Sequence, residues 1–300
     1  MNSTEPANSN PIKVAHAVRN ATGSVTSLLR RWLRRFVRQL RQLRHLGRAP
    51  VVLIDEALWH RASIPYVFVA RLTAEENRRL RLIASEFLSR KKFFGAGGFE
   101  VTELIRVQIA AQACILILEL GTDGYEGWND IVIYPATFRT RREVTDSAGV
   151  VHTTTAVLAG EAWLGGPVVL SYDAITKADD MDAQNVVIHE FAHKLDMQNG
   201  PANGFPPLHR GMKKSAWNRA FMAGYLDFCA RADQAKVDAY RDGGAALQLL
   251  PLDAYAAENP AEFFAVISEA FFEAPQTVKA AFPAVYQQLA LFYRQDHTLK

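Results

Sequence analysis

Cysteine is nearly absent from this sequence of 300 residues, which contains only Cys114 and Cys229. Two isolated cysteines, each inside an apolar stretch, exclude both a disulfide framework and a zinc site built from thiolates. The two residues therefore predict buried thiols in a reducing compartment.

Long apolar runs are absent as well. The longest nearly uncharged run is VQIAAQACILIL at residues 107–118, which is shorter than the ~20 residues that a membrane-spanning helix needs and predicts a core element. The polar start MNSTEPANSNPIK is not followed by the apolar stretch and small-residue cleavage site of a secretory signal. We therefore expect a cytoplasmic protein without a membrane span.

Acidic residues are scarce in the first 50 positions, where Glu5 stands against Lys13 and nine arginines. This segment has a net charge of +9. Because the whole chain has a net charge of +3, the remaining 250 residues have a net charge of −6. Residues 1–23 are polar and rich in turn-forming residues, which predicts disorder. Residues 24–50 predict a basic amphipathic helix, because apolar residues and arginines separate onto two faces at helical period.

This basic helix has three interpretations. Its apolar face can pack on the rest of the protein, it can lie on an anionic membrane surface or a partner, or it can touch nucleic acid. Aromatic residues that stack on bases are sparse, so direct nucleic-acid binding is not expected. Each basic residue near an anionic membrane surface contributes about 1 kcal/mol to the free energy of binding. We therefore expect the full-length chain to bind such membranes peripherally and in a salt-sensitive way.

Residues 51–300 have the composition of one globular domain, and their signals run from helix to strands to helices. Residues 73–91 predict an amphipathic helix with Thr73 at its N-cap. Helical patterns run from Ala183 to the end. Strands followed by helices predict an α+β fold rather than alternating βαβ units. The strands are expected at residues 130–138, 150–160 and 166–175.

The stretch NVVIHEFAHKLDMQNG, residues 185–200, places His189 and His193 four positions apart. On a helix, both imidazoles then point to one side, where they can bind one metal ion. Glu190 lies one position round the helix, which suits a general base acting on a zinc-bound water rather than a ligand. Asp196 returns to the same face and is expected to accept the second ring proton of a ligating histidine. The alternative is a helix whose polar face merely contains these residues.

A third ligand would decide between these interpretations. Asn199 excludes the pattern in which a third histidine follows the second by six residues. His209 lies in a proline-rich stretch, where a rigid ligand is harder to hold. Glu262 is the preferred candidate, because it lies in an apolar helix and a carboxylate in a core needs a charge partner. Its alternative role is a capping box with Asn259, and Glu269, two turns further on, is a candidate either to orient a ligand or for a structural role.

Taken together, these segments resemble the Mlc titration factor A family of zinc metallopeptidases, which is similar to the catalytic domain of anthrax lethal factor. The resemblance covers most of residues 51–300 and implies a zincin-like fold of the gluzincin type. Such a fold has a small sheet, an active-site helix and a following helix that carries the third ligand. The matching stretches are ELG, VIYPATF, GPVVLSY, IHEFAHKLDMQNG, DAYAAENPAEFFAVISEAFF and FPAVYQQL.

The resemblance also implies roles for individual residues. His189, His193 and Glu262 would bind zinc, Glu190 would be the base, and Tyr255 would help to stabilise the oxyanion. The alternative for Tyr255 is an aromatic residue of the core.

Two functions follow from the resemblance. The first is zinc-dependent hydrolysis of small peptides, of the aminopeptidase kind reported for relatives. The second is regulation, since some relatives bind Mlc, a glucose-responsive transcriptional repressor of the bacterial cytoplasm; a protein that sequesters such a repressor needs little or no peptidase activity. For the peptidase, residues 166–175 are the predicted edge strand beside which a peptide substrate would add.

Overall fold

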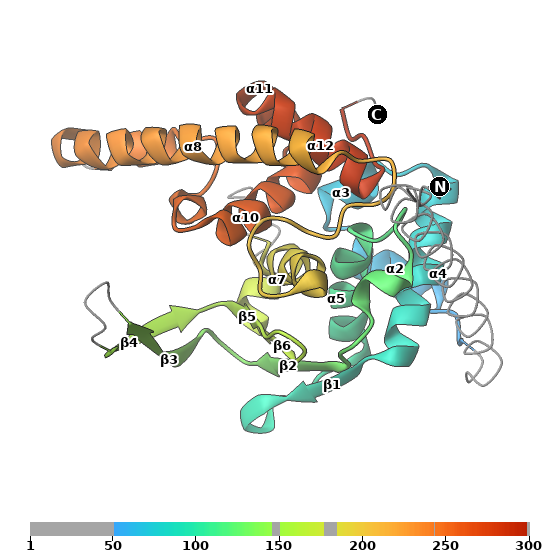
Figure 1. Cartoon of the computed structure of the whole chain (residues 1–300). Coiled ribbons are helices and arrows are strands. Elements are labelled where there is room, and N and C mark those ends of the chain that lie inside the picture. The colour runs from blue at the N-terminus through green and yellow to red at the C-terminus, as the bar shows by residue number, and fades with distance from the viewer. Residues whose placement is uncertain (1–50, 146–150, 177–184, 243, 299–300) are drawn as a thin grey trace, which may run out of the picture. The chain divides into compact units, whose positions relative to one another are not determined.

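The computed structural model describes residues 51–145, 151–176, 185–242 and 244–298 (Figure 1). The predicted disordered segment 1–23 and the predicted basic helix 24–50 lie outside the described residues. The compact unit that begins at Val51 combines helices with a small sheet, which confirms the α+β prediction. Within the described part of the chain, no helix is both long and apolar enough to span a bilayer.

The first part of this unit is helical and contains α2 (Glu56–Ser63), α3 (Val67–Ala70), α4 (Ala74–Arg90) and α5 (Glu103–Ile115). The N-cap predicted at Thr73 is confirmed: its hydroxyl accepts a hydrogen bond from the Glu76 N–H, and the Glu76 carboxylate accepts one from the Thr73 N–H. The apolar run 107–118 forms most of α5 and the turns after it, and it is almost entirely buried. The prediction that this run belongs to the core is therefore confirmed.

The main sheet has four strands in the order β1 (Lys92–Gly95), β2 (Asp130–Tyr134), β6 (Val168–Ser171) and β5 (Gly160–Ala162). β1, β2 and β6 are parallel, and β5 runs antiparallel to β6. β1, α5 and β2 form one βαβ unit, which the sequence did not predict because β1 is only four residues long. β3 (Phe138–Thr145) and β4 (Val151–Leu158) form a separate antiparallel pair that extends from the sheet (Figure 1).

The prediction that residues 166–175 form an edge strand is wrong. β6 lies between β2 and β5, all four of its residues are buried, and α6 (Tyr172–Thr176) begins directly after it. An unbroken apolar run such as Val168–Leu170 is typical of a strand covered on both faces, not of an edge. The edge strand beside β6 is β5, whose first residue, Gly160, is the last residue of the strand predicted at 150–160.

The C-terminal part is helical, as predicted, and places α7 (Val186–Asp196) between the sheet and α10 (Pro260–Glu273) (Figure 1). Buried apolar residues of α7 hold it there; the Phe191 ring, for example, contacts Phe87, Tyr125 and Trp128. Burying such a ring contributes roughly 1.5–3 kcal/mol. The remaining elements are α8 (Lys214–Asp242), α9 (Ala245–Gln248), α11 (Pro275–Ala281), α12 (Pro283–Tyr293) and the 3-10 turns η2 (Ala96–Gly98), η3 (Thr122–Tyr125), η5 (Met197–Asn199) and η6 (Ala254–Ala257).

Candidate metal centre

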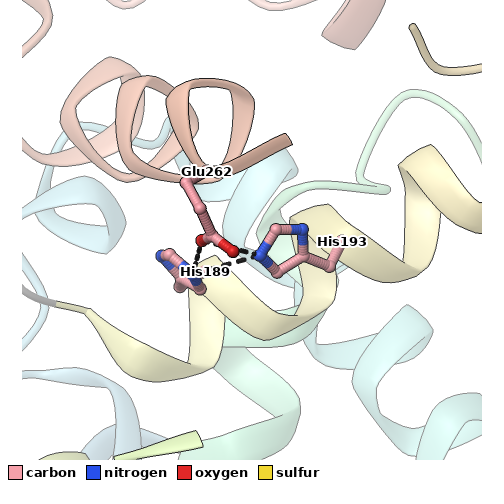
Figure 2. A group of neighbouring side chains, drawn as sticks. All are labelled: His189, His193 and Glu262. Carbon is pink, nitrogen blue, oxygen red and sulfur yellow. Dashed lines mark hydrogen bonds and ion pairs between the residues drawn. The ribbon is translucent and has the colours of Figure 1, made fainter. Parts of the chain in front are cut away.

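α7 carries both histidines of the sequence motif on one face. Asn185 caps the helix, because its side-chain oxygen accepts a hydrogen bond from the Ile188 N–H at 2.9 Å. The helix then places His189 and His193 one turn apart, with 3.2 Å between their Nε2 atoms. Both rings point toward Glu262, at the beginning of α10 (Figure 2).

Glu262 meets the two histidines from the first turn of α10. Its Oε2 lies 3.1 Å from His189 Nε2 and 3.2 Å from His193 Nε2 (Figure 2). Asn259 caps this helix through its own side chain, which accepts hydrogen bonds from the N–H groups of Ala261 and Glu262. The helix cap therefore uses the side chain of Asn259, and the carboxylate of Glu262 is left to contact the two histidines.

The spacing of these three donor atoms fits a metal ion. A tetrahedral zinc ion with ligands at about 2.0–2.1 Å separates its donor atoms by about 3.3 Å, close to the 3.1–3.2 Å between these atoms. The side chains of His189 and Glu262 are 14% exposed and that of His193 is 9% exposed, so the donors are shielded yet reachable. His209, the other histidine considered, lies elsewhere, with its Nε2 bonded to the Leu291 carbonyl.

Glu269 contacts the other ring nitrogen of His189. Its Oε1 lies 2.6 Å from His189 Nδ1, and its Oε2 accepts a hydrogen bond from the Asn185 N–H at 2.8 Å. A proton held between Nδ1 and this carboxylate leaves Nε2 free to bind a metal. Of its two candidate roles, Glu269 therefore has the position to orient a ligating histidine.

Electrostatics at the donors favour a positive charge. Burial by itself lowers the pKa of His189, but the carboxylates of Glu269 and Glu262 outweigh burial and raise it well above its ordinary value. Burial raises the pKa of Glu262, yet hydrogen bonds from both histidines outweigh this and hold it below its ordinary value. The raised pKa of His189 favours a protonated, positively charged ring beside the two carboxylates. A metal ion bound at the same place would also supply positive charge.

Asp196 is the last residue of α7 and contacts the segment that follows the helix. This buried carboxylate accepts hydrogen bonds through Oδ2 from the N–H groups of Asn203 and Gly204, both at 2.7 Å. Burial raises the pKa of Asp196, and these two N–H groups oppose the rise. Through Oδ2, Asp196 thus holds the segment after α7, which forms one wall of the pocket.

A pocket of about 500 Å³ opens over the three donors. Glu190 lies in the wall of this pocket and is only 4% exposed. Burial raises the pKa of its carboxyl group, and the charge of His189 opposes this rise. Tyr255, in η6, is 40% exposed, and its ring centroid lies 6.2 Å from that of His189. The edge strand β5 also lines the pocket, with Gly160 beside Glu190.

Lys194 was not singled out as a functional residue from the sequence, although it lies in the motif. Its Nζ is buried and donates hydrogen bonds to the carbonyls of Trp163 and Gly166, at 2.6 and 2.7 Å. Nζ also lies 4.6 Å from the centroid of the Trp128 ring. Burial lowers the pKa of Lys194 to about 8. This contact ties the turn after β5 to α7.

Two histidines one turn apart on a buried helix, with a glutamate between them and a carboxylate from a later helix, are the donor arrangement of metallopeptidases. The family model of the glucose-regulated metallo-peptidase M90 matches residues 37–294. The chain belongs to this family, and membership implies that it uses a metal ion.

Relatives of known name support the same assignment. The chain is 39% identical over 243 residues to the Mlc titration factor A of Yersinia pestis (strain Pestoides F), a match that covers 80% of this chain and 85% of the relative. The values are the same for the Mlc titration factor A of Yersinia pseudotuberculosis serotype O:1b (strain IP 31758). The family resemblance inferred from the sequence motifs is therefore confirmed.

Proposed function

We propose that this protein is a zinc-dependent peptidase with a zincin-like fold of the gluzincin type, which removes residues from the amino end of small peptides. His189, His193 and Glu262 are the proposed zinc ligands. The observation that carries the proposal is the group of three donor atoms 3.1–3.2 Å apart on two buried helices. Membership of a metallopeptidase family supports it.

Glu190 is the proposed general base. When bound, Zn²⁺ would polarise the peptide carbonyl and lower the pKa of a water molecule from about 15.7 to about 7. The Glu190 carboxylate would accept the proton of the attacking water and later deliver it to the leaving amine. Its burial supports this role, because a raised pKa makes the carboxylate a stronger base toward the proton of water.

Tyr255 and β5 are the proposed contacts to the substrate. The Tyr255 ring stands beside His189 at the mouth of the pocket, where its hydroxyl would donate a hydrogen bond to the oxyanion. The peptide backbone would pair with Gly160–Ala162, because β5 is the sheet edge that lines the pocket.

The direct test is hydrolysis of a panel of amino-acid anilides and short peptides by the full-length chain. We expect cleavage that stops when a chelator removes the metal and returns when Zn²⁺ is added back. Blocking the substrate amino group by acetylation should prevent cleavage if the enzyme acts from the amino end. Absence of hydrolysis across the panel by protein loaded with Zn²⁺ would contradict the proposal.

Glu269→Gln is expected to weaken metal binding by about 10–100-fold, because a neutral amide holds the Nδ1 proton of His189 less strongly than a carboxylate. Competition with a chromogenic chelator measures the change. Glu273→Gln is the matched control: this carboxylate lies one turn further along α10 and accepts a hydrogen bond from Asn185 Nδ2 instead of a histidine. Equal metal affinity of Glu269→Gln and wild type would rule out the role of Glu269.

A second candidate function is the sequestration of a transcriptional repressor of the Mlc type, with little or no peptidase activity. Its support is the name of the relatives, Mlc titration factor A, at 39% identity. Both functions would operate in the cytoplasm, and residues 1–50 are the proposed contact to anionic membranes. Pull-down of an Mlc-type repressor by protein that hydrolyses no substrate would favour sequestration over peptidase activity.

A further inference from the structure

Gly160, the first residue of β5, leaves no space for a side chain. A Cβ atom at this position would lie 2.6 Å from Glu190 Oε1, 2.7 Å from Glu190 Cγ and 2.7 Å from Val186 Cγ2. Gly160 is not among the glycines with positive φ. Space, and not backbone conformation, therefore requires glycine here.

Neither of the two elements in contact at Gly160 is free to move away. Gly160 pairs with Leu170 of the interior strand β6, and the adjoining Ala159 carbonyl accepts a hydrogen bond from the Ser171 N–H at 2.8 Å. On the other side, α7 is packed between the sheet and α10. An added methyl group must therefore displace the Glu190 side chain, to which two of the three closest atoms belong, together with the Val186 methyl group.

We propose that Gly160 is a positioning residue for Glu190: the bare backbone of β5 sets where the carboxylate stands relative to the three metal donors. The same contact brings the strand proposed to pair with the substrate directly against the proposed base. The catalytic consequence rests on the proposed function, whereas the steric coupling between Gly160 and Glu190 does not.

Gly224 supplies a matched control. A Cβ atom there would also lie 2.6 Å from another side chain, but that side chain is Val285, in the core between α8 and α12. Gly224→Ala therefore reproduces the overpacking without reaching the pocket.

The kinetic test compares Gly160→Ala, Gly224→Ala and wild type, all loaded with Zn²⁺. We expect Gly160→Ala to keep one zinc ion per chain and a KM within about twofold, and to lose kcat by at least ~10-fold, because the base is misplaced while the ligands are not. Gly224→Ala should keep both kinetic parameters. A Gly160→Ala protein with the kcat of wild type would overturn the proposal.

A second measurement does not depend on activity. Gly160→Ala is made in Glu190→Gln protein, whose side chain has the same size, and in Glu190→Ala protein, which lacks the atoms in the way. We expect Gly160→Ala to lower Tm by about 4 °C with glutamine at position 190 and clearly less with alanine, Val186 accounting for the remainder. Gly224→Ala should lower Tm equally in both backgrounds.

The two measurements separate the inference from the proposed function. If wild type hydrolyses no substrate, the proposed function fails, and the Tm comparison alone decides on Gly160. Equal Tm losses for Gly160→Ala in the two backgrounds would overturn the inference. If Gly160→Ala alone does not fold, the double variant with Glu190→Ala is expected to fold, and its failure to do so would also overturn the inference.

Discussion

Glu190→Gln is expected to retain its metal ion and to lose peptide hydrolysis by at least ~100-fold. The substitution preserves the size of the side chain, so the packing against Gly160 is unchanged. The three atoms that would hold the metal come from other residues, and their spacing does not depend on Glu190. An amide cannot accept the proton of an attacking water, so only the chemical step should fail.

The measurement pairs kcat on a cleavable anilide with elemental analysis of the same preparation. Glu119→Gln is a suitable control, because that carboxylate pairs with Arg79 away from the pocket and should leave both values unchanged. Hydrolysis by Glu190→Gln at the wild-type rate would show that another group accepts the proton. Loss of metal together with activity would instead assign Glu190 to metal binding.

His189→Ala is expected to lower the metal content from about one ion per chain to nearly none. Catalytic zinc sites use three protein ligands, and two remaining donors do not hold the ion against dialysis. The variant also leaves Glu262 and Glu269 without the ring that lies between them. Removing one partner of buried charged groups destabilises a fold, so Tm should fall as well, although Glu262 keeps its contact to His193 and Glu269 keeps the Asn185 N–H.

Glu262→Gln separates loss of metal from loss of stability. The amide removes the charge of the third donor without emptying its position, and we expect weaker metal binding with a smaller change in Tm than in His189→Ala. His209→Ala is the matched histidine control and should keep its metal, because this ring bonds to the Leu291 carbonyl outside the site. Full metal content in His189→Ala would refute the assignment of the ligands.

Local features of this protein were determined by the sequence itself. The N-cap at Thr73, the buried run 107–118 and the placement of His189 and His193 on one helical face all depend on residues within a few positions of one another. Helical period and capping are set by such short-range geometry, so they can be read without knowing the rest of the fold.

Contacts between residues far apart in the sequence were decided only by the tertiary structure. The sequence left Glu262 with two roles, and named both Asp196 and Glu269 as partners of a histidine. Packing of α10 on α7 brings Glu262 and Glu269 to His189 across 73 and 80 residues, while Asp196 turns to the loop that follows its own helix.

The sheet edge was decided in the same way. β5 has three residues, too few for a periodic signal, and it becomes the edge only because β6 pairs with β2 on its other side. The close approach of Gly160 to Glu190 follows from that pairing. Contacts of this kind depend on how whole elements pack, and element packing is not encoded in the neighbourhood of either residue.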